Sequence, residues 1–238
     1  MEKQPKCSYC ETFDEKPHCH NCKVFKKAVT NRDPQEIPYS LEEMVKYIKD
    51  PQSTFDGDFR VGDYKDVTLY GGEKIRIVLI DTEVDDLADG SGKAKTTFAV
   101  MPVDGAYEMN LEATNAGGYV ASRMRNYILP RYLALLPEEL RKEIKPVTKK
   151  TYTGSSITTS SESIWLFSEI EIGWRNAYSQ PGEGEGYEYF FVAKNRPSSE
   201  YVWTRSIKGS QSFCIAHSKY LDYTYSNNRY KVAFGFCI

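Results

Sequence analysis

The sequence predicts an α+β protein with a mixed or antiparallel sheet and flanking helices, and three observations lead to this prediction. Short runs of β-branched and aromatic residues recur along the chain, which is the composition of buried strands. Only a few segments have the apolar spacing of an amphipathic helix. In residues 201–238, three strand-like runs follow one another so closely that they can pair antiparallel. We therefore expect this last stretch to form the central sheet.

The composition is that of a globular protein. The chain has 238 residues, 40% of them hydrophobic, which is enough to build a packed core. A formal net charge of −2 gives no electrostatic reason to expect nucleic acid or an anionic membrane as the main partner. No apolar run approaches the roughly 20 residues of a membrane span, and the N-terminus shows no secretory signal. A protein made in a reducing cytoplasm is expected, so its cysteines are not interpreted first as disulfides.

Four cysteines near the N-terminus have the spacing of a zinc knuckle. Cys7 and Cys10 form one C-x-x-C pair, and Cys19 and Cys22 form the second. Two such pairs complete a tetrahedral thiolate site, and the ion replaces a core that so short a segment cannot build. The pattern predicts one Zn²⁺ in a head of residues 1–30. The two histidines that flank Cys19 are alternative ligands, and unrelated thiols or two redox pairs are the alternative interpretation.

Residues 31–54 are predicted to hold a linker followed by one capped helix. Ser40 and Glu43 have the S-x-x-E spacing of a capping box, and apolar residues then recur at helical spacing as far as Ile48. This apolar stripe needs a surface to cover. Both the main domain and a partner protein remain open as that surface.

The main domain is predicted to span residues 55–238. A hairpin is expected over residues 67–80, with a Gly-Gly turn and apolar residues on both faces of its second strand. Ile75, Ile77 and Leu79 share one face, and Arg76, Val78 and Ile80 share the other. The acidic loop at residues 81–92 suits calcium by its carboxylates, but Asp and Gly are also turn residues, so both interpretations stay open. Residues 95–101 are expected to resume as a strand.

Helices and loops are predicted to alternate with strands in the rest of this domain. A second helix is expected over residues 119–129, ended by Pro130, and a third begins at Pro137. The apolar face of the helix over residues 119–129 should hold Val120, Met124, Tyr127 and Ile128. Residues 151–163 are rich in Ser and Thr and are expected to form an exposed, mobile loop.

Several later segments have more specific expectations. Residues 164–167 read as a short buried strand, and Ser168 as a cap-like serine before an acidic turn. Trp165 and Trp203 are predicted core aromatics. A flexible glycine loop at residues 182–186 should precede an inward-packed aromatic segment at residues 187–191.

The ordered set of motifs resembles a known family. The segments are GGEKIRIV at residues 71–78, GGYVASRMR at 117–125, LPEEL at 136–140, IWLFSEIE at 164–171, WTRS at 203–206 and FGFCI at 234–238. Together they are similar to an uncharacterised domain family of Firmicutes and their prophages. That family resembles the C-type-lectin-like fold of formylglycine-generating enzymes and phage tropism determinants. The resemblance covers residues 55–238 and implies a C-type-lectin-like fold for them.

The resemblance implies a non-catalytic structural or recognition protein. A lectin-like fold holds long loops on a rigid sheet, and the Tyr- and Asn-rich loop near the C-terminus has the composition of an adaptable binding surface. The candidate ligand-binding residues are Tyr220, Tyr223, Tyr225, Asn227, Asn228 and Arg229. We expect a phage or prophage virion component from the tail, baseplate or head decoration, made in the bacterial cytoplasm and homo-oligomeric in its assembly. Virion proteins or a host-surface glycan are the expected partners.

Three alternatives to a recognition role remain. The first is a purely structural virion protein whose loops contact neighbouring subunits. The second is an oxidase related to the formylglycine-generating enzymes, although Cys214 and Cys237 each lie in an apolar strand and are expected to be core residues. The third is a nucleic-acid-binding protein led by the zinc head. For the head itself, anchoring to an assembly and packing on its own domain are both open.

Overall fold

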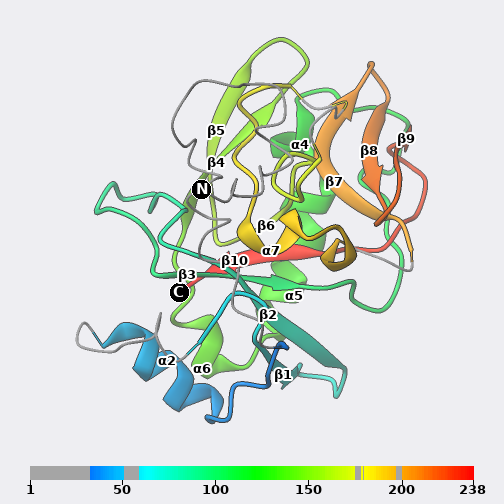
Figure 1. Ribbon diagram of the computed structural model, residues 1–238. Coiled ribbons are helices and arrows are strands. Elements are labelled where there is room, and N and C mark those ends of the chain that lie inside the picture. Colours follow the sequence, from blue (N-terminus) through cyan, green and yellow to red (C-terminus); the bar gives the residue numbers. More distant parts are fainter. Residues whose placement is uncertain (1–32, 51–58, 175–177, 179, 197–199) are drawn as a thin grey trace, which may run out of the picture.

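The computed structural model describes residues 33–50, 59–174, 178, 180–196 and 200–238. The predicted zinc head of residues 1–30, with Cys7, Cys10, Cys19 and Cys22, lies outside the described residues. Within them the chain forms three antiparallel sheets and a few short helices (Figure 1). This confirms the predicted α+β class with antiparallel sheets. Among the described residues, no helix is long and apolar enough to cross a membrane.

The largest sheet has five strands in the order β1-β2-β3-β10-β6. Their bounds are Tyr64–Thr68 for β1, Lys74–Thr82 for β2, Thr96–Val100 for β3, Phe234–Cys237 for β10 and Ile164–Leu166 for β6. The pairing of β1 with β2 confirms the predicted hairpin. Ile77 and Leu79 face one hydrophobic core, whereas Val78 and Ile80 face a second core on the other side. This sheet is therefore buried on both faces.

The predicted central sheet at residues 201–238 is wrong in one respect, because its last strand joins the five-stranded sheet. Strand β10 lies between β3 and β6, and the ring of Phe236 stacks on that of Phe98. A Cβ atom at Gly235 would lie 2.9 Å from ring atoms of Trp165 and of Phe167. Only a glycine allows this close approach, so Gly235 fits a strand buried between two others.

The other two predicted strands of this stretch and an additional strand, β9, form a separate sheet with the order β7-β8-β9. Its strands are β7 at Val202–Lys208, β8 at Ser212–Ala216 and β9 at Leu221–Tyr225. The register of β7 against β8 shifts between Trp203 and Ile207. Such an irregularity re-aims the side chains within it, here including Arg205. Trp165 and Trp203 are both buried, as predicted.

Helix α2 at Leu41–Lys49 packs on the domain rather than projecting from it. The predicted capping box is present, because Ser40 Oγ accepts the Glu43 N–H and the Glu43 carboxylate accepts the Ser40 N–H. The buried residues of α2 belong to the same core as the five-stranded sheet. Lys49 of α2 bonds Glu143 at 2.7 Å, just beyond α6 at Glu138–Arg141. The surface that this stripe covers is therefore the chain's own domain.

The predicted second helix is longer and less regular than expected. It consists of α4 at Gly118–Ala121, a π-helical turn at Met124–Ile128, and α5 at Leu129–Leu135. Pro130 does not end it, because this proline lies in the first turn of α5, where a missing N–H costs no hydrogen bond. Tyr127 was expected on the apolar face but is 67% exposed, since the wider π-helical turn changes the helical spacing.

Residues 151–163 do not form the predicted loop, because most of them belong to a hairpin. Strand β4 at Val147–Tyr152 pairs with β5 at Ile157–Glu162. Alternate residues of β4, namely Val147, Lys149 and Thr151, are buried. Thr has a high strand propensity, which composition alone did not separate from loop character. The remaining helices are α7 at Glu188–Phe191 and a 3-10 turn at Ala193–Asn195.

Candidate functional site

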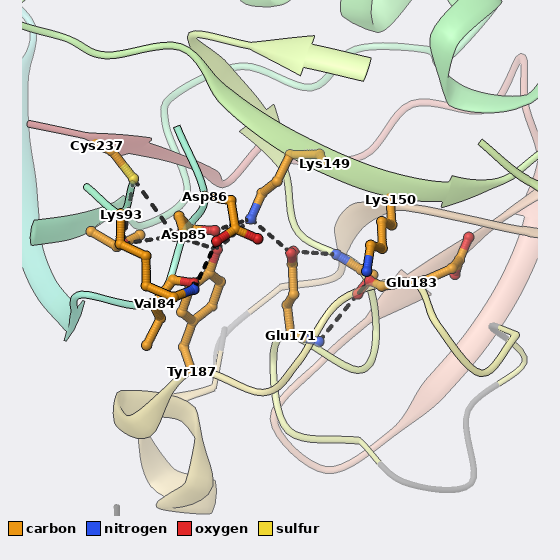
Figure 2. A network of polar contacts seen from close by, with 12 residues as sticks. Val84, Asp85, Asp86, Lys93, Lys149, Lys150, Glu171, Glu183, Tyr187 and Cys237 are labelled. Atoms are coloured by element: carbon orange, nitrogen blue, oxygen red, sulfur yellow. Dashed lines mark hydrogen bonds and ion pairs between the residues drawn. The ribbon is translucent and has the colours of Figure 1, made fainter. Parts of the chain in front are cut away.

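A buried network of charged and phenolic side chains is the main polar feature of the described structure (Figure 2). We call it the polar network and define it by six buried residues. They are Asp85 after β2, Lys149 on β4, Glu171 and Glu183 in the segments after β6, Tyr187 before α7, and Arg205 on β7. Because burying a charge is costly unless it is paired, the partners of each group decide what the network can do.

The ammonium group of Lys149 lies in a cage of three oxygen atoms. Its Nζ is 2.5 Å from Oδ1 of Asp85 and 2.6 Å from the phenolic oxygen of Tyr187. A third oxygen, Oε1 of Glu171, is 2.9 Å away, and Figure 2 shows the two side chains pointing toward each other. The same Nζ lies 4.2 Å from the centroid of a Trp165 ring. All three N–H donors of the ammonium therefore have an acceptor within reach.

The carboxylate of Asp85 receives hydrogen bonds on both oxygen atoms. The hydroxyl of Thr97 donates to Oδ2 at 2.7 Å, and the Tyr187 hydroxyl is 3.0 Å from each oxygen. The thiol of Cys237 also lies 3.6 Å from Oδ2. Burial pushes the pKa of Asp85 up, but the charge of Lys149 and these hydrogen bonds outweigh it and hold the pKa below its ordinary value.

Arg205 holds Glu171 in a bidentate ion pair. One guanidinium nitrogen donates to Oε2 of Glu171, and the other donates to Oε1 at 2.9 Å. The remaining donors reach the backbone carbonyls of Leu166, Lys150 and Glu183. Arg205 is thus fully satisfied, and it joins β7 to β4, to β6 and to the segment around residue 183.

The predicted cap-like Ser168 belongs to a second capping box, which is buried. Its Oγ accepts the Glu171 N–H at 3.1 Å, and its own N–H donates to Oε2 of Glu171 at 3.0 Å. Ser168 Oγ also donates to the carbonyl of Glu183 at 2.8 Å. The box therefore orients the carboxylate that meets Lys149 and Arg205.

The segment predicted as a flexible glycine loop, residues 182–186, is anchored by Glu183. One oxygen of Glu183 accepts the Tyr152 N–H at 2.6 Å, and the other accepts the Ser206 hydroxyl at 2.7 Å. A Cβ atom at Gly184 would lie 2.8 Å from Oε1 of Glu171, so the network packs directly against this glycine. Burial raises the pKa of Glu183 above its ordinary value.

Burial and neighbouring charges also change the pKa of Lys149 and that of Tyr187. It lowers the pKa of Lys149, but the carboxylates of Asp85 and Glu171 more than offset this, so the pKa lies above its ordinary value. Burial and the nearby Asp85 charge raise the pKa of Tyr187 well above its ordinary value. At neutral pH Lys149 and Arg205 are therefore cationic, the Asp85 carboxyl group is ionised, and the Tyr187 phenol is neutral.

A polar cavity of about 160 Å³ opens onto this network. Its wall includes Asp85, Lys149, Glu171 and Tyr187. The exposed residues of its lining include Asp86 and Lys93, which bond each other at 2.9 Å, together with Lys150 and Glu185. The buried charged groups in the wall of this cavity are already bonded to one another.

The acidic loop at residues 81–92 does not gather its carboxylates around one point. Asp81 accepts the N–H of Glu188, Asp85 binds Lys149, and Asp89 accepts the N–H of Ser91. In the part of the chain that the structure describes, no group of three or more His, Cys, Asp or Glu side chains could hold a metal ion. The turn interpretation of this loop is the one its hydrogen bonds support.

The six predicted ligand-binding residues are not brought together in one place. Tyr223 and Tyr225 share one face of β9, and their side chains are 46% and 55% exposed. The ring of Tyr178 contacts that of Tyr223, with centroids 5.1 Å apart. We call Tyr178, Tyr223 and Tyr225 the tyrosine face. Tyr220 instead stacks on His217, whose ring also contacts Tyr201.

The other three predicted residues lie in the turn after β9. Asn227 is exposed. The side-chain amide of Asn228 donates to the Thr224 hydroxyl, and the Arg229 guanidinium donates to the carbonyl of Ala106 at 2.9 Å. Two of these polar groups therefore fold the turn, which leaves the exposed rings as the larger available contact surface.

The outer edge of β9 is protected against pairing with an added strand. The Tyr223 N–H is accepted by the carboxylate of the adjacent Asp222 at 2.8 Å, and the carbonyl of Tyr225 accepts the N–H of Asn228. A charged side chain on an edge strand also disfavours pairing with another chain. A ligand of this region would therefore meet the rings rather than the backbone.

Comparison with known proteins gives a family but no activity. Residues 91–237, more than half of the chain, match the family model described as a domain of unknown function, DUF6273. The chain belongs to the DUF6273 family. No curated protein and no solved structure matched it. The DUF6273 region contains five members of the polar network, while Asp85 precedes it.

The DUF6273 region also contains the two cysteines that bear on an oxidase function. Cys214 and Cys237 are buried, as predicted, and are not joined in a disulfide. Burial raises the pKa of both thiols, and the nearby Glu169 raises that of Cys214 further. Because the thiolate is the reactive form, these environments favour unreactive core cysteines.

The sequence did not reveal the polar network as a unit. Its signals were separate: an S-x-x-E spacing at Ser168, an arginine within a strand-like run, and a lysine in a Ser/Thr-rich segment. A charged residue at a buried position of a strand is a usable signal, but only once the strand is known. Since no strand was predicted at Lys149, and the last two residues of β4 fell in the predicted loop of residues 151–163, Lys149 gave no such signal.

Proposed function

We propose that this DUF6273 protein is a non-catalytic recognition protein with a C-type-lectin-like fold, and that it serves as a phage or prophage virion component. The observation that carries the proposal is the tyrosine face on β9. Two rings there are about half exposed although the hydrophobic cores are close by. Exposed rings with few rotatable bonds provide a large contact area at low entropic cost, as binding surfaces require.

The state of the buried charges supports a non-catalytic role toward external substrates. The cavity above the polar network is lined by groups that are already bonded to one another. Both thiols of the domain have a raised pKa, which disfavours the nucleophilic form. These features fit a rigid scaffold better than an oxidase.

A glycan is the ligand class that suits the tyrosine face. The flat apolar faces of sugar rings pack against aromatic rings, and Tyr hydroxyls and the nearby amide of Asn227 offer hydrogen bonds. Asp222 protects the backbone edge of β9 against an added peptide strand. A host-surface polysaccharide therefore fits this surface better than an extended peptide.

The test is binding of the full chain to purified cell walls from a panel of Firmicutes species. We expect the double variant Tyr223→Ala/Tyr225→Ala to lose at least about tenfold in affinity, which corresponds to about 1.4 kcal/mol. The matched control is Tyr70→Ala/Tyr127→Ala, because these tyrosines are 54% and 67% exposed but lie elsewhere. Equal losses in both variants, or no binding by the parent to any wall, would contradict the proposal.

We also propose that Cys7, Cys10, Cys19 and Cys22 hold one Zn²⁺ in a head that anchors the chain to its assembly. Metal analysis should find one zinc per chain, lost in Cys7→Ser/Cys19→Ser. The anchoring role is tested by deleting residues 1–32, which leaves the buried Ile37 and its bond to β1 intact. The shortened protein should stay folded but fail to enter the particle. Unfolding on deletion would show instead that the head stabilises the domain.

A further inference from the structure

The polar network places an amine directly against a carboxyl group from a distant part of the chain. Lys149 Nζ lies 2.5 Å from Oδ1 of Asp85, and the two residues are 64 positions apart. A second carboxylate, Glu171, contacts the same nitrogen through Oε1 at 2.9 Å. Figure 2 shows these groups converging from separate segments of the chain. An amine, an acceptor carboxyl and an adjacent acid–base group are the components that amide formation requires.

The two reacting groups are buried beside aromatic rings. Lys149 is 3% and Asp85 is 7% exposed, and the rings of Trp165 and Tyr187 lie beside the ammonium. Burial opposes the charged form of both partners, and their mutual charge and hydrogen bonds hold the pKa of Asp85 below and that of Lys149 above its ordinary value. Proton transfer between them removes both charges from the interior, and the amide product carries none.

We propose that Lys149 and Asp85 become joined by an intramolecular isopeptide bond after the chain folds, with Glu171 acting as general base and acid. In the first step one proton passes from Nζ to Oδ1 of Asp85, which leaves a neutral amine beside a neutral carboxyl group. The nitrogen electron pair then attacks Cγ of Asp85. Glu171 takes a second proton from the nitrogen as the C–N bond forms and gives it to Oδ1. The Cγ–Oδ1 bond breaks, and Oδ1 leaves as water.

The step is balanced without any added reagent. An ammonium and a carboxylate become a secondary amide and one water molecule, so no oxidant, reductant or activating group is needed. The remaining oxygen, Oδ2, becomes the amide carbonyl. Thr97 donates a hydrogen bond to it at 2.7 Å, and Tyr187 is within 3.0 Å, so the negative charge that develops on this atom is stabilised.

Two further residues hold the reacting groups in position. Arg205 binds Glu171 through both carboxylate oxygens, which fixes the orientation of this carboxylate beside Lys149. Ser168 fixes the same carboxylate through the buried capping box. Because Arg205 and Ser168 act on the reacting pair through Glu171, both are positioning residues. The cavity above the network gives the released water a way out.

The deciding experiment is the mass of the intact, denatured parent protein after incubation in its folded state. We expect it to be lighter than its sequence by one water molecule. Digestion with trypsin should then yield one branched peptide that contains both Lys149 and Asp85. An unchanged mass overturns the proposal. So does a water loss that maps to a cyclised Asp-Gly pair such as Asp89-Gly90, or to Glu171 instead of Asp85.

Variants then test the assigned roles. Lys149→Arg should have the full sequence mass, and Asp85→Asn should lose ammonia in place of water while forming the same bond. Glu171→Gln should slow bond formation by about 100-fold or more, the range for a general acid–base group. Lys150→Arg and Glu185→Gln, at the same cavity, are the matched controls and should form the bond as the parent does. Normal bond formation in Glu171→Gln would remove Glu171 from the mechanism.

Discussion

The polar network and the tyrosine face use polar side chains in opposite ways. In the network, six buried groups from segments far apart in the sequence satisfy one another, down to the last N–H of Arg205. On the tyrosine face, Tyr223 and Tyr225 are exposed, and the backbone beneath them is closed by Asp222. The first arrangement holds elements together, and the second leaves surface available.

The comparison also shows what the recognisable motifs encode. The segments IWLFSEIE and WTRS supply Ser168, Glu171 and Arg205, which meet in the buried network. Glu171 also lines the polar cavity. These two segments therefore hold buried parts of the domain together, while the tyrosine face lies outside them.

The largest expected effect on stability comes from replacing the buried Arg205 rather than the exposed Arg76. Arg205→Met should cost about 3–5 kcal/mol of unfolding free energy, because it removes the bidentate partner of the buried Glu171 and leaves three backbone carbonyls without this donor. Arg76→Met removes a similar ion pair, with Asp66, but both partners are about half exposed, so its cost should be about 0–1 kcal/mol. Urea unfolding measures both. Equal costs would mean that the network does not hold the fold together.

The two capping boxes allow a closer comparison within one motif. Ser168→Ala removes a buried cap and a hydrogen bond to the Glu183 carbonyl, and should cost about 2–3 kcal/mol. Ser40→Ala removes the same S-x-x-E cap at the exposed start of α2, and should cost about 1 kcal/mol. Thermal or urea unfolding measures both losses. A larger loss of unfolding free energy in Ser40→Ala than in Ser168→Ala would contradict the expectation that burial strengthens the cap.

A pH-dependent effect is expected from Glu183. The pKa of Glu183 is raised in the folded state, so its carboxyl group stabilises the fold at a pH below 4.5, its pKa in the unfolded chain. This contribution is lost as the pH rises through the pKa of the folded state. Glu183→Gln has no such loss. The unfolding free energy of the variant relative to the parent should therefore increase between about pH 4 and pH 7. A difference that stays constant across this range would show that the pKa is not raised.

The smallest expected effect on stability belongs to the tyrosine face. Tyr223→Ala and Tyr225→Ala should each change the unfolding free energy by no more than about 0.5 kcal/mol, as is usual for exposed positions. The same substitutions should reduce cell-wall binding. If either variant were destabilised by several kcal/mol, the ring would be part of the core rather than available for a ligand.

Local signals in the sequence predicted several parts of the fold. The capping box and apolar spacing placed α2, the Gly-Gly turn placed the β1-β2 hairpin, and apolar runs identified the burial of Trp165 and Trp203. These features depend on residues within a few positions of one another, so their physical causes are present in a short segment. The same holds for Ser168, whose partner Glu171 is three residues away.

Only the tertiary structure decided the position of β10 and the composition of the polar network. Strand β10 has the composition of any buried strand, and its place between β3 and β6 depends on the rings of Trp165 and Phe167 packing over Gly235. Lys149 likewise meets Asp85 across 64 residues, after β4 has formed and been placed against the turn that carries Glu171. The sequence by itself determined the elements and their buried faces because these follow from local spacing. Which charges meet was decided by the packing of those elements, since a buried ion pair is stable only where the whole fold supplies its partners.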